Sequence, residues 1–553
     1  MRRVRWWIVA VAVGLASWLG FGLPSADGPV APPDLVTGKV LHSGKPVAGA
    51  VVRLQGSLRR TRSSPSGSFE LRLGKHRAKK VITAWAPGHY IGWATLTGNT
   101  NRAVIHLRKH YQSDNPDYGW FSAEGAHGSA SCGHCMPQHY EEWLGDAHAQ
   151  SAVNPRFLTV YEGTDTQGNK SPLTRYVSTP DYMRTPLPVD RTKPYYGPGY
   201  KLDFPDSTGN CATCHVPAAA AKPGKAYDAD PTHITGIERE GIFCEFCHKI
   251  GGVVLDPKSR LPYPNRPGVL SMRLYRPARG EELFFGTFDD VTRRVTYLPL
   301  QSESAFCAPC HYGVFWDTVV YNSYGEWLDS PYSNPETGQT CQDCHMLPTK
   351  DRFFVLPEKG GVERPPGRIF NHRMTGVTDV ALMTDTARLD VAAARRQDRI
   401  TVAVQVTNEK GGHHIPTDHP SRQILLIVQA CGRDGQALPY LGDVRLPWWA
   451  GQGDEPDDYA GRPGKAFAKI LQESWTGAWP SIAYWNPTVV REDTRIPALG
   501  TDISRYEFRA PSDGGPVTIQ ARLIFRRAFK HLARQKKWDL TDMLMERKTV
   551  QLP

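Results

Sequence analysis

The chain has 553 residues, which predicts about two to four domains rather than one. Its 51 glycines and 45 prolines favour loops, turns and short strands over long helices. The formal charge of +11 is spread along the chain, with only a mildly basic stretch at residues 526–547, so the composition gives no indication of nucleic-acid binding.

Residues 1–26 have the pattern of a secretory signal peptide or a signal anchor. Arg2, Arg3 and Arg5 precede an uncharged stretch, residues 6–23, which is long for a signal core and just long enough to span a bilayer. A cut after Ala26 would place Pro24 at the −3 position, so cleavage and retention as a membrane anchor both stay open. In either case we expect the rest of the chain to cross the inner membrane into the periplasm or the medium, and no later segment has the pattern of a membrane span.

Residues 34–110 alternate apolar and polar residues around short turns, as in a small all-β domain. This segment resembles the carboxypeptidase regulatory-like family, a transthyretin-like β-sandwich. The resemblance implies an accessory or docking module, and it is carried by Val36-x-Gly38-x-Val40, Gly44-x-Pro46-Val47-x-Gly49-Ala50, Gly67-x-Phe69 and Ala84-x-Ala86-x-Gly88-x-Tyr90.

Ten of the eleven cysteines form five C-x-x-C pairs in residues 115–370. The pairs are Cys132/Cys135, Cys211/Cys214, Cys244/Cys247, Cys307/Cys310 and Cys341/Cys344. Four pairs are followed directly by a histidine: His215, His248, His311 and His345. With 19 histidines in the chain, four such matches in five have a chance probability on the order of 10⁻⁵.

The C-x-x-C-H pattern is typical of covalent haem c attachment. Two thiols at this spacing can form thioethers to one haem, and the adjacent histidine then faces the iron as an axial ligand. Disulfides or zinc ribbons could use the thiols, but neither requires the histidine, and zinc needs C-x-x-C units closer together than these. We therefore expect haem c as the cofactor, five groups if Cys132 and Cys135 are used and four if they are not.

The remaining sequence completes the expected fold class. Residues 115–370 are rich in turns and predict a mainly helical and irregular haem domain, with short helices after each haem motif and at residues 136–152. Residues 371–553 return to strands and predict a second β-sandwich, with a surface helix near residues 526–544. Cys431 ends an apolar run and is expected to be a buried free thiol in a strand.

The haem region resembles a family of secreted multihaem cytochromes c in the motif style of cytochrome c-554, hydroxylamine oxidoreductase and the ammonia-forming nitrite reductases. The segments that carry the resemblance are GIFCEFCHKI (241–250), FCAPCHYGVFWDTVVYNSYGEWLDSPYSNPETGQTCQDCHMLP (306–348), NHRMTG (371–376) and GHHIPTDHPSR (412–422). By family position the resemblance implies that the second axial ligands are His148, His233, His372 and His413. His414 and His419 compete with His413, and spacing alone does not pair these residues with haems.

Met136 stands where the other four motifs have histidine. Three interpretations remain open. Met136 or a nearby histidine (His127, His134 or His139) ligates the iron, or one axial position of an attached haem is open, or Cys132 and Cys135 form a disulfide. Nitrite reductases of this style replace the same histidine with lysine at their catalytic haem, so the departure marks where catalysis would be sought.

Electron transfer between periplasmic or extracellular redox partner proteins is the leading hypothesis. The first alternative is an oxidoreductase that acts on a small nitrogen or sulfur compound at the haem of Cys132/Cys135. The second is a structural cytochrome that self-associates, for example as a filament through exposed strand edges. No motif indicates a nucleic-acid partner.

Overall fold

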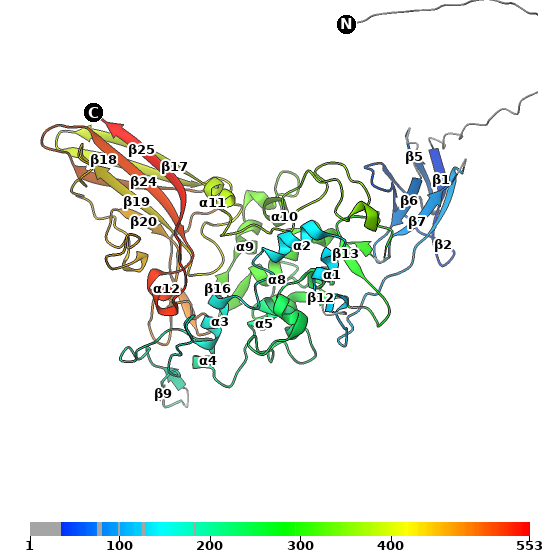
Figure 1. Ribbon diagram of the computed structural model, residues 1–553, viewed down its shortest axis with the longest axis horizontal. Helices are drawn as coiled ribbons and strands as arrows, with labels where there is room; N and C mark the ends of the chain where they lie inside the picture. Colours follow the sequence, from blue (N-terminus) through cyan, green and yellow to red (C-terminus); the bar gives the residue numbers. More distant parts are fainter. Residues whose placement is uncertain (1–34, 75–79, 98–99, 124–127, 182–183, 294) are drawn as a thin grey trace, which may run out of the picture.

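The computed structural model describes residues 35–553 except 75–79, 98–99, 124–127, 182–183 and 294. The predicted signal segment therefore lies outside the described residues, as does His127. Among the residues described, no helix is long and apolar enough to cross a membrane. Three parts follow one another along the molecule, in chain order from right to left in Figure 1.

The N-terminal part consists of two four-stranded sheets with a shared apolar core. One contains β1 (Leu35–His42), β2 (Lys45–Pro46), β5 (Ser68–Arg72) and β8 (Arg102–His106), and the other has the order β4 (Arg60–Arg62), β3 (Val51–Leu54), β6 (Lys80–Trp85), β7 (Gly92–Leu96). Buried residues of both sheets belong to one cluster that includes Val36, Val52 and Ile105. Gly38 is required there, because a Cβ atom would lie 2.0 Å from the Ala103 carbonyl oxygen.

The middle part is made of short helices and two-stranded ribbons. The helices are α1 (Ala130–Gly133), α2 (Pro137–Leu144), α3 (Pro155–Glu162), α4 (Tyr200–Asp203), α5 (Ala212–His215), α6 (Pro217–Ala220), α7 (Cys244–Cys247), α8 (Ala308–His311), α9 (Ser323–Leu328) and α10 (Cys341–His345). The ribbons are β9 (Tyr176–Ser178) with β10 (Arg184–Pro186), β11 (Ile250–Val253) with β12 (Met272–Leu274), β13 (Phe284–Gly286) with β14 (Val295–Tyr297), and β15 (Gly313–Phe315) with β16 (Thr318–Tyr321).

Single 3₁₀ turns connect these elements. They are η1 (Phe121–Ala123), η2 (Gly236–Glu240), η3 (Gly268–Ser271), η4 (Pro299–Ser302), η5 (Ser304–Phe306), η6 (Pro331–Ser333), η7 (Pro357–Lys359) and, in the C-terminal part, η8 (Trp448–Ala450).

The C-terminal part is again built on sheets around one core. One sheet has the order β17 (Ala387–Arg396), β18 (Arg399–Asn408), β23 (Thr501–Arg509), and the other has the order β20 (Gly464–Phe467), β19 (Gln423–Cys431), β24 (Val517–Arg526), β25 (Met543–Leu552). A ribbon of β21 (Lys469–Glu473) and β22 (Thr488–Asp493) and the helices α11 (Val380–Thr386) and α12 (Lys530–Lys536) complete it. Buried residues of both sheets, among them Leu389, Val404 and Ile519, share one cluster.

Three local predictions need correction. At four motifs a short helix coincides with the motif itself, because the helical turn contains the motif cysteines, whereas the predicted helices that directly follow a motif occur after Met136 (α2) and after His215 (α6). Helix α12 is short and packs inward, with Lys530, Leu532, Ala533 and Lys536 buried, because Lys536 finds three carbonyl acceptors in the middle part. Cys431 lies in β19 as expected but is only partly buried.

Candidate haem-binding sites

Each C-x-x-C-H motif forms one helical turn that presents its histidine at the end. His215, His311 and His345 are the last residues of α5, α8 and α10, and His248 caps α7 with φ −79° and ψ 2°. This turn places both thiols and the imidazole on the same side of the chain. All ten motif cysteines are free, partly buried thiols.

Three motif histidines face a second histidine at the separation that one iron atom between them would require. With a metal–nitrogen bond of about 2 Å and about 1.1 Å from nitrogen to ring centre, two imidazoles on one iron have centres about 6.2 Å apart. The ring centres are 6.2 Å apart for His148–His311, 6.5 Å for His248–His372 and 6.3 Å for His345–His413. The residues present therefore fit three haems with two histidine ligands each.

The second nitrogen is held in the manner of metal ligands in four of these six rings and in His215. A ligating histidine usually donates its other N–H to a carbonyl or carboxylate oxygen, which fixes the ring and leaves Nε2 free for the metal. The Nδ1 distances are 2.6 Å to Asp146 Oδ1 for His148, 2.6 Å to Phe285 O for His248, 2.6 Å to Thr375 O for His345, 2.9 Å to His414 O for His413 and 3.2 Å to Ser151 O for His215. Mainly through burial, the pKa values of His215 and His345 fall to about 4 and that of His372 to about 3, so these rings are neutral at pH 7, as ligands must be.

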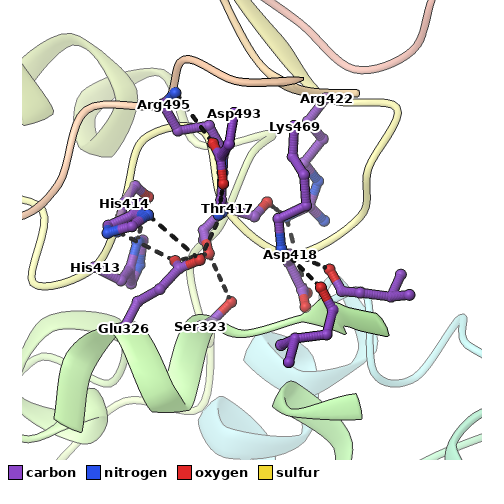
Figure 2. Close-up of polar contacts among 12 residues, drawn as sticks. Ser323, Glu326, His413, His414, Thr417, Asp418, Arg422, Lys469, Asp493 and Arg495 are labelled. Carbon is purple, nitrogen blue, oxygen red and sulfur yellow. Dashed lines mark hydrogen bonds and ion pairs between the residues drawn. The ribbon is translucent and has the colours of Figure 1, made fainter. Parts of the chain in front are cut away.

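The loop that carries His413 is anchored by one buried carboxylate (Figure 2). Glu326 of α9 accepts hydrogen bonds from Arg495 Nη1 at 2.5 Å, Thr417 Oγ1 at 2.5 Å and the His414 backbone N–H at 3.2 Å. Burial would raise the pKa of Glu326, but the Arg495 charge and the Thr417 bond outweigh it, and the pKa is lowered. The carboxylate therefore joins the haem region to the start of the C-terminal part.

His215 has a different environment from the other three motif histidines. Its ring is stacked on Phe157 with centres 3.8 Å apart and planes within 1°. His233, predicted as a second axial ligand of an unassigned haem, lies in a turn closed by Asp230. Its side chain is 82% exposed, and it makes no ring contact with a motif histidine among the residues described. The sequence indicated His419 only as an alternative to His413. Its ring centre lies 6.1 Å from that of Tyr484 and 6.2 Å from that of Tyr321.

Met136 does not have the backbone conformation of the four motif histidines. Its φ is −130° and its ψ is 59°, because Pro137 follows it and disfavours the helical region for the residue before a proline. Two histidines lie near Met136 in the sequence. His134 accepts a hydrogen bond from Lys359 at the surface, and His139 packs against His372 with ring centres 4.7 Å apart. The predicted ligand role of Met136 stays a prediction.

The five attachment sites adjoin one another. The thiols of Cys132 and Cys244, of Cys307 and Cys341, and of Cys310 and Cys214 lie close to one another, and this proximity together with burial raises the pKa of Cys132, Cys307 and Cys310 well above the ordinary thiol value. Cys247 is close enough to Cys307 and Cys310 that its charge also raises their pKa. The sites thus form one connected series from Cys132/Cys135 through Cys244/Cys247 to Cys307/Cys310, which adjoins both remaining sites.

Comparison with solved structures relates this arrangement to a multihaem fold. The chain is similar to the crystal structure of a penta-heme cytochrome c552 from Thermochromatium tepidum, with 19% identity and a TM-score of 0.50 over 77% of this chain and 98% of that chain. No protein-family model and no curated protein matches the chain. The likeness supports a multihaem cytochrome fold, whereas the carboxypeptidase-like resemblance of residues 34–110 stays a prediction.

Proposed function

We propose that the chain is a multihaem c-type cytochrome that transfers electrons between redox partner proteins in the periplasm or outside the cell. The observation that carries the proposal is the set of three histidine pairs at 6.2–6.5 Å, each with one member in a C-x-x-C-H motif. Iron with two histidine ligands is low-spin and has no free position, which suits an electron carrier rather than a catalyst.

The connected attachment sites supply the path. Electron tunnelling between haems weakens steeply with edge-to-edge distance, so adjoining porphyrins exchange electrons fastest. Thiols that lie close to one another across motifs, such as Cys132 with Cys244 and Cys307 with Cys341, would bring the edges of the attached haems together. The site of Cys307/Cys310 would be the branch point of this path.

The sheet-containing parts on either side of the haem region would serve docking. The N-terminal part contacts the haem region through Arg53, which forms an ion pair with Asp289 at 2.7 Å, and through Trp85, which donates to Thr296 at 3.1 Å. Anchoring through residues 6–23 and self-association belong to the same proposal. Sizing of the matured protein with and without residues 1–26, and its partition into membranes, test them.

The experiment for the main proposal is maturation of the full chain in a host that attaches haem c. Four or five covalent haems by intact mass, with reversible reduction of all of them in a potentiometric titration, support electron transfer. A chain that matures without covalent haem contradicts the proposal.

A second function is favoured at Cys132/Cys135 by the non-helical backbone of Met136. If Met136 does not reach the iron, this haem has a free position at which a small nitrogen or sulfur compound could be reduced or oxidised. Nitrite or hydroxylamine turnover that is lost in Met136→His, with haem content unchanged, would support this enzyme; equal turnover in both proteins would contradict it.

A further inference from the structure

The strand β13 of the haem region holds His248 by both its backbone and its ring. The Phe285 backbone N–H donates to the His248 carbonyl oxygen at 2.9 Å, and the Phe285 carbonyl oxygen accepts from His248 Nδ1 at 2.6 Å. The side chain of the next motif residue, Lys249, donates to the Leu283 carbonyl oxygen at 2.5 Å. The position of β13 therefore fixes the orientation of this histidine ring, which faces His372 with ring centres 6.5 Å apart.

The other strand of the ribbon is held by the N-terminal part, and Figure 1 shows β13 on the side of the haem region that faces the N-terminal sheets. Thr296 of β14 is the register partner of Phe285 and is fully buried. Its hydroxyl accepts from Trp85 Nε1 at 3.1 Å and donates to the His89 carbonyl oxygen at 2.6 Å. One hydroxyl thus joins the N-terminal part to the strand position that lies beside Phe285.

Tyr90 of the N-terminal part packs against β13 itself. Its ring shares one buried cluster with Leu283 and Phe285, and its hydroxyl donates to the Glu282 carbonyl oxygen at 2.8 Å. Leu283 and Phe285 are the two residues whose carbonyl oxygens hold the His248 segment. Contacts from the N-terminal part therefore reach the residues that orient the ligand.

A buried ion pair fixes the segment that follows β13. Both carboxylate oxygens of Asp290 lie 2.6 Å from Arg364 Nη1, and neither side chain is more than 4% exposed. From the N-terminal part, the Gly56 N–H donates to Asp290 Oδ2 at 2.8 Å and Gln55 Nε2 donates to the Asp290 carbonyl oxygen at 2.9 Å. Hydrogen bonds to a charge shielded from water are strong, so we expect the ribbon and the N-terminal part to move as one body.

We propose that Thr296 is a positioning residue for the haem of the His248 motif, and that through it the N-terminal part lowers the reduction potential of this haem. The inference rests on the proposed multihaem function and gives the N-terminal part a role beyond docking. A carbonyl acceptor on Nδ1 makes a ligating imidazole a stronger electron donor, which favours ferric over ferrous iron. Loss of the fixed ribbon position would weaken that acceptor at this haem alone.

The test uses the matured full-length protein, with haem content measured on the same sample, and follows each low-spin EPR signal in a potentiometric titration. The signal that His372→Ala removes identifies the haem of the His248 motif. In Thr296→Val this signal should change its g values, and at a given potential the ratio of reduced to oxidised haem should rise at least threefold, about 28 mV for one electron. Thr296→Ser keeps the hydroxyl and should retain the wild-type values.

Two further variants separate positioning from general damage to the fold. Trp85→Phe removes the indole donor on the N-terminal side and should shift the same signal in the same direction. Thr318→Val removes a hydroxyl that donates to the Thr488 carbonyl oxygen in another ribbon of the haem region, and it should leave this haem unchanged.

Two results would overturn the inference. If Thr296→Val unfolds more readily in chemical denaturation but the potential of this haem is unchanged or lower, Thr296 is a structural contact only. If every haem shifts equally, the variant has altered the fold as a whole. In both cases the haems are present and the proposed function stands, whereas a wild-type protein without covalent haem would contradict the proposed function itself.

Discussion

His413 and His414 are adjacent in the sequence but have different surroundings, which makes them a matched pair for testing axial ligation. The His413 ring lies opposite His345, with centres 6.3 Å apart and planes within 6°. The His414 ring faces the Glu326 carboxylate, with Nδ1 3.7 Å from Oε1. We therefore expect His413→Ala to remove one axial ligand and His414→Ala to remove none.

The magnitude follows from the one-to-one pairing. His413→Ala should convert one haem equivalent, about a fifth of the iron if five haems are bound, from low-spin to high-spin and should raise the reduction potential of that haem. EPR spin quantitation of the oxidised protein, with haem content determined in parallel, measures this. A high-spin equivalent in His414→Ala and none in His413→Ala would refute the assignment of the pair.

Three further predictions concern stability and the spectrum of a single haem. Glu326→Ala should lower the free energy of unfolding by about 3 kcal/mol at pH 7, because it leaves the buried Arg495 guanidinium with one carboxylate fewer. The pKa of Glu326 is lowered in the folded protein, so this difference in stability between wild type and variant should disappear as the pH falls below about 4. Burial lowers the pKa of Lys536 to about 7. Between pH 7 and about 10 this side chain therefore binds fewer protons in the folded than in the unfolded chain, so the stability of the wild type should rise with pH over that range. Lys536→Met should abolish the rise. The His148 and His311 ring planes cross at 70°, which leaves the iron orbitals that they split nearly degenerate, so this haem should give the low-spin EPR signal with the largest g value, and His148→Ala should remove it.

Each of these predictions has a control in the chain. Glu409→Ala breaks a half-exposed ion pair and should cost less than about 1 kcal/mol. Lys537→Met changes the neighbouring, exposed lysine and should keep the rise of stability with pH. His233→Ala should leave every low-spin signal in place. Chemical denaturation from about pH 2 to about pH 10 measures the first two. An advantage over Glu326→Ala that persists at about pH 2 would contradict the first, and wild-type stability that does not rise between pH 7 and about 10 would contradict the second.

The covalent part of the site could be predicted from the sequence because it is local. Two thiols and a histidine at fixed spacing define an attachment turn whatever surrounds it, and each of these turns is helical in the structure. The non-helical backbone conformation of Met136 has a local cause as well, since the following residue, Pro137, disfavours the helical region for it.

The pairing of second ligands could not be predicted, because it depends on loops far apart in the chain. His148 faces His311, and His413 faces His345 only because Glu326 holds its loop against α9. The turn closed by Asp230 keeps His233 at the surface, and no sequence pattern distinguished it from the partly buried His419. The flanking sheets were expected because apolar and polar residues alternate along their strands. The buried contacts of α12 were not expected, because only the fold brings Lys536 to the three carbonyl oxygens of other segments that accept its hydrogen bonds.

The most direct test of the central claim is the number of covalent haems and of haems with two histidine ligands in the same matured sample, by intact mass and by EPR of the oxidised protein. The account predicts at least four covalent haems, with at least three low-spin signals of the two-histidine type from the pairs at 6.2–6.5 Å. Fewer than three such signals at full haem content would contradict it.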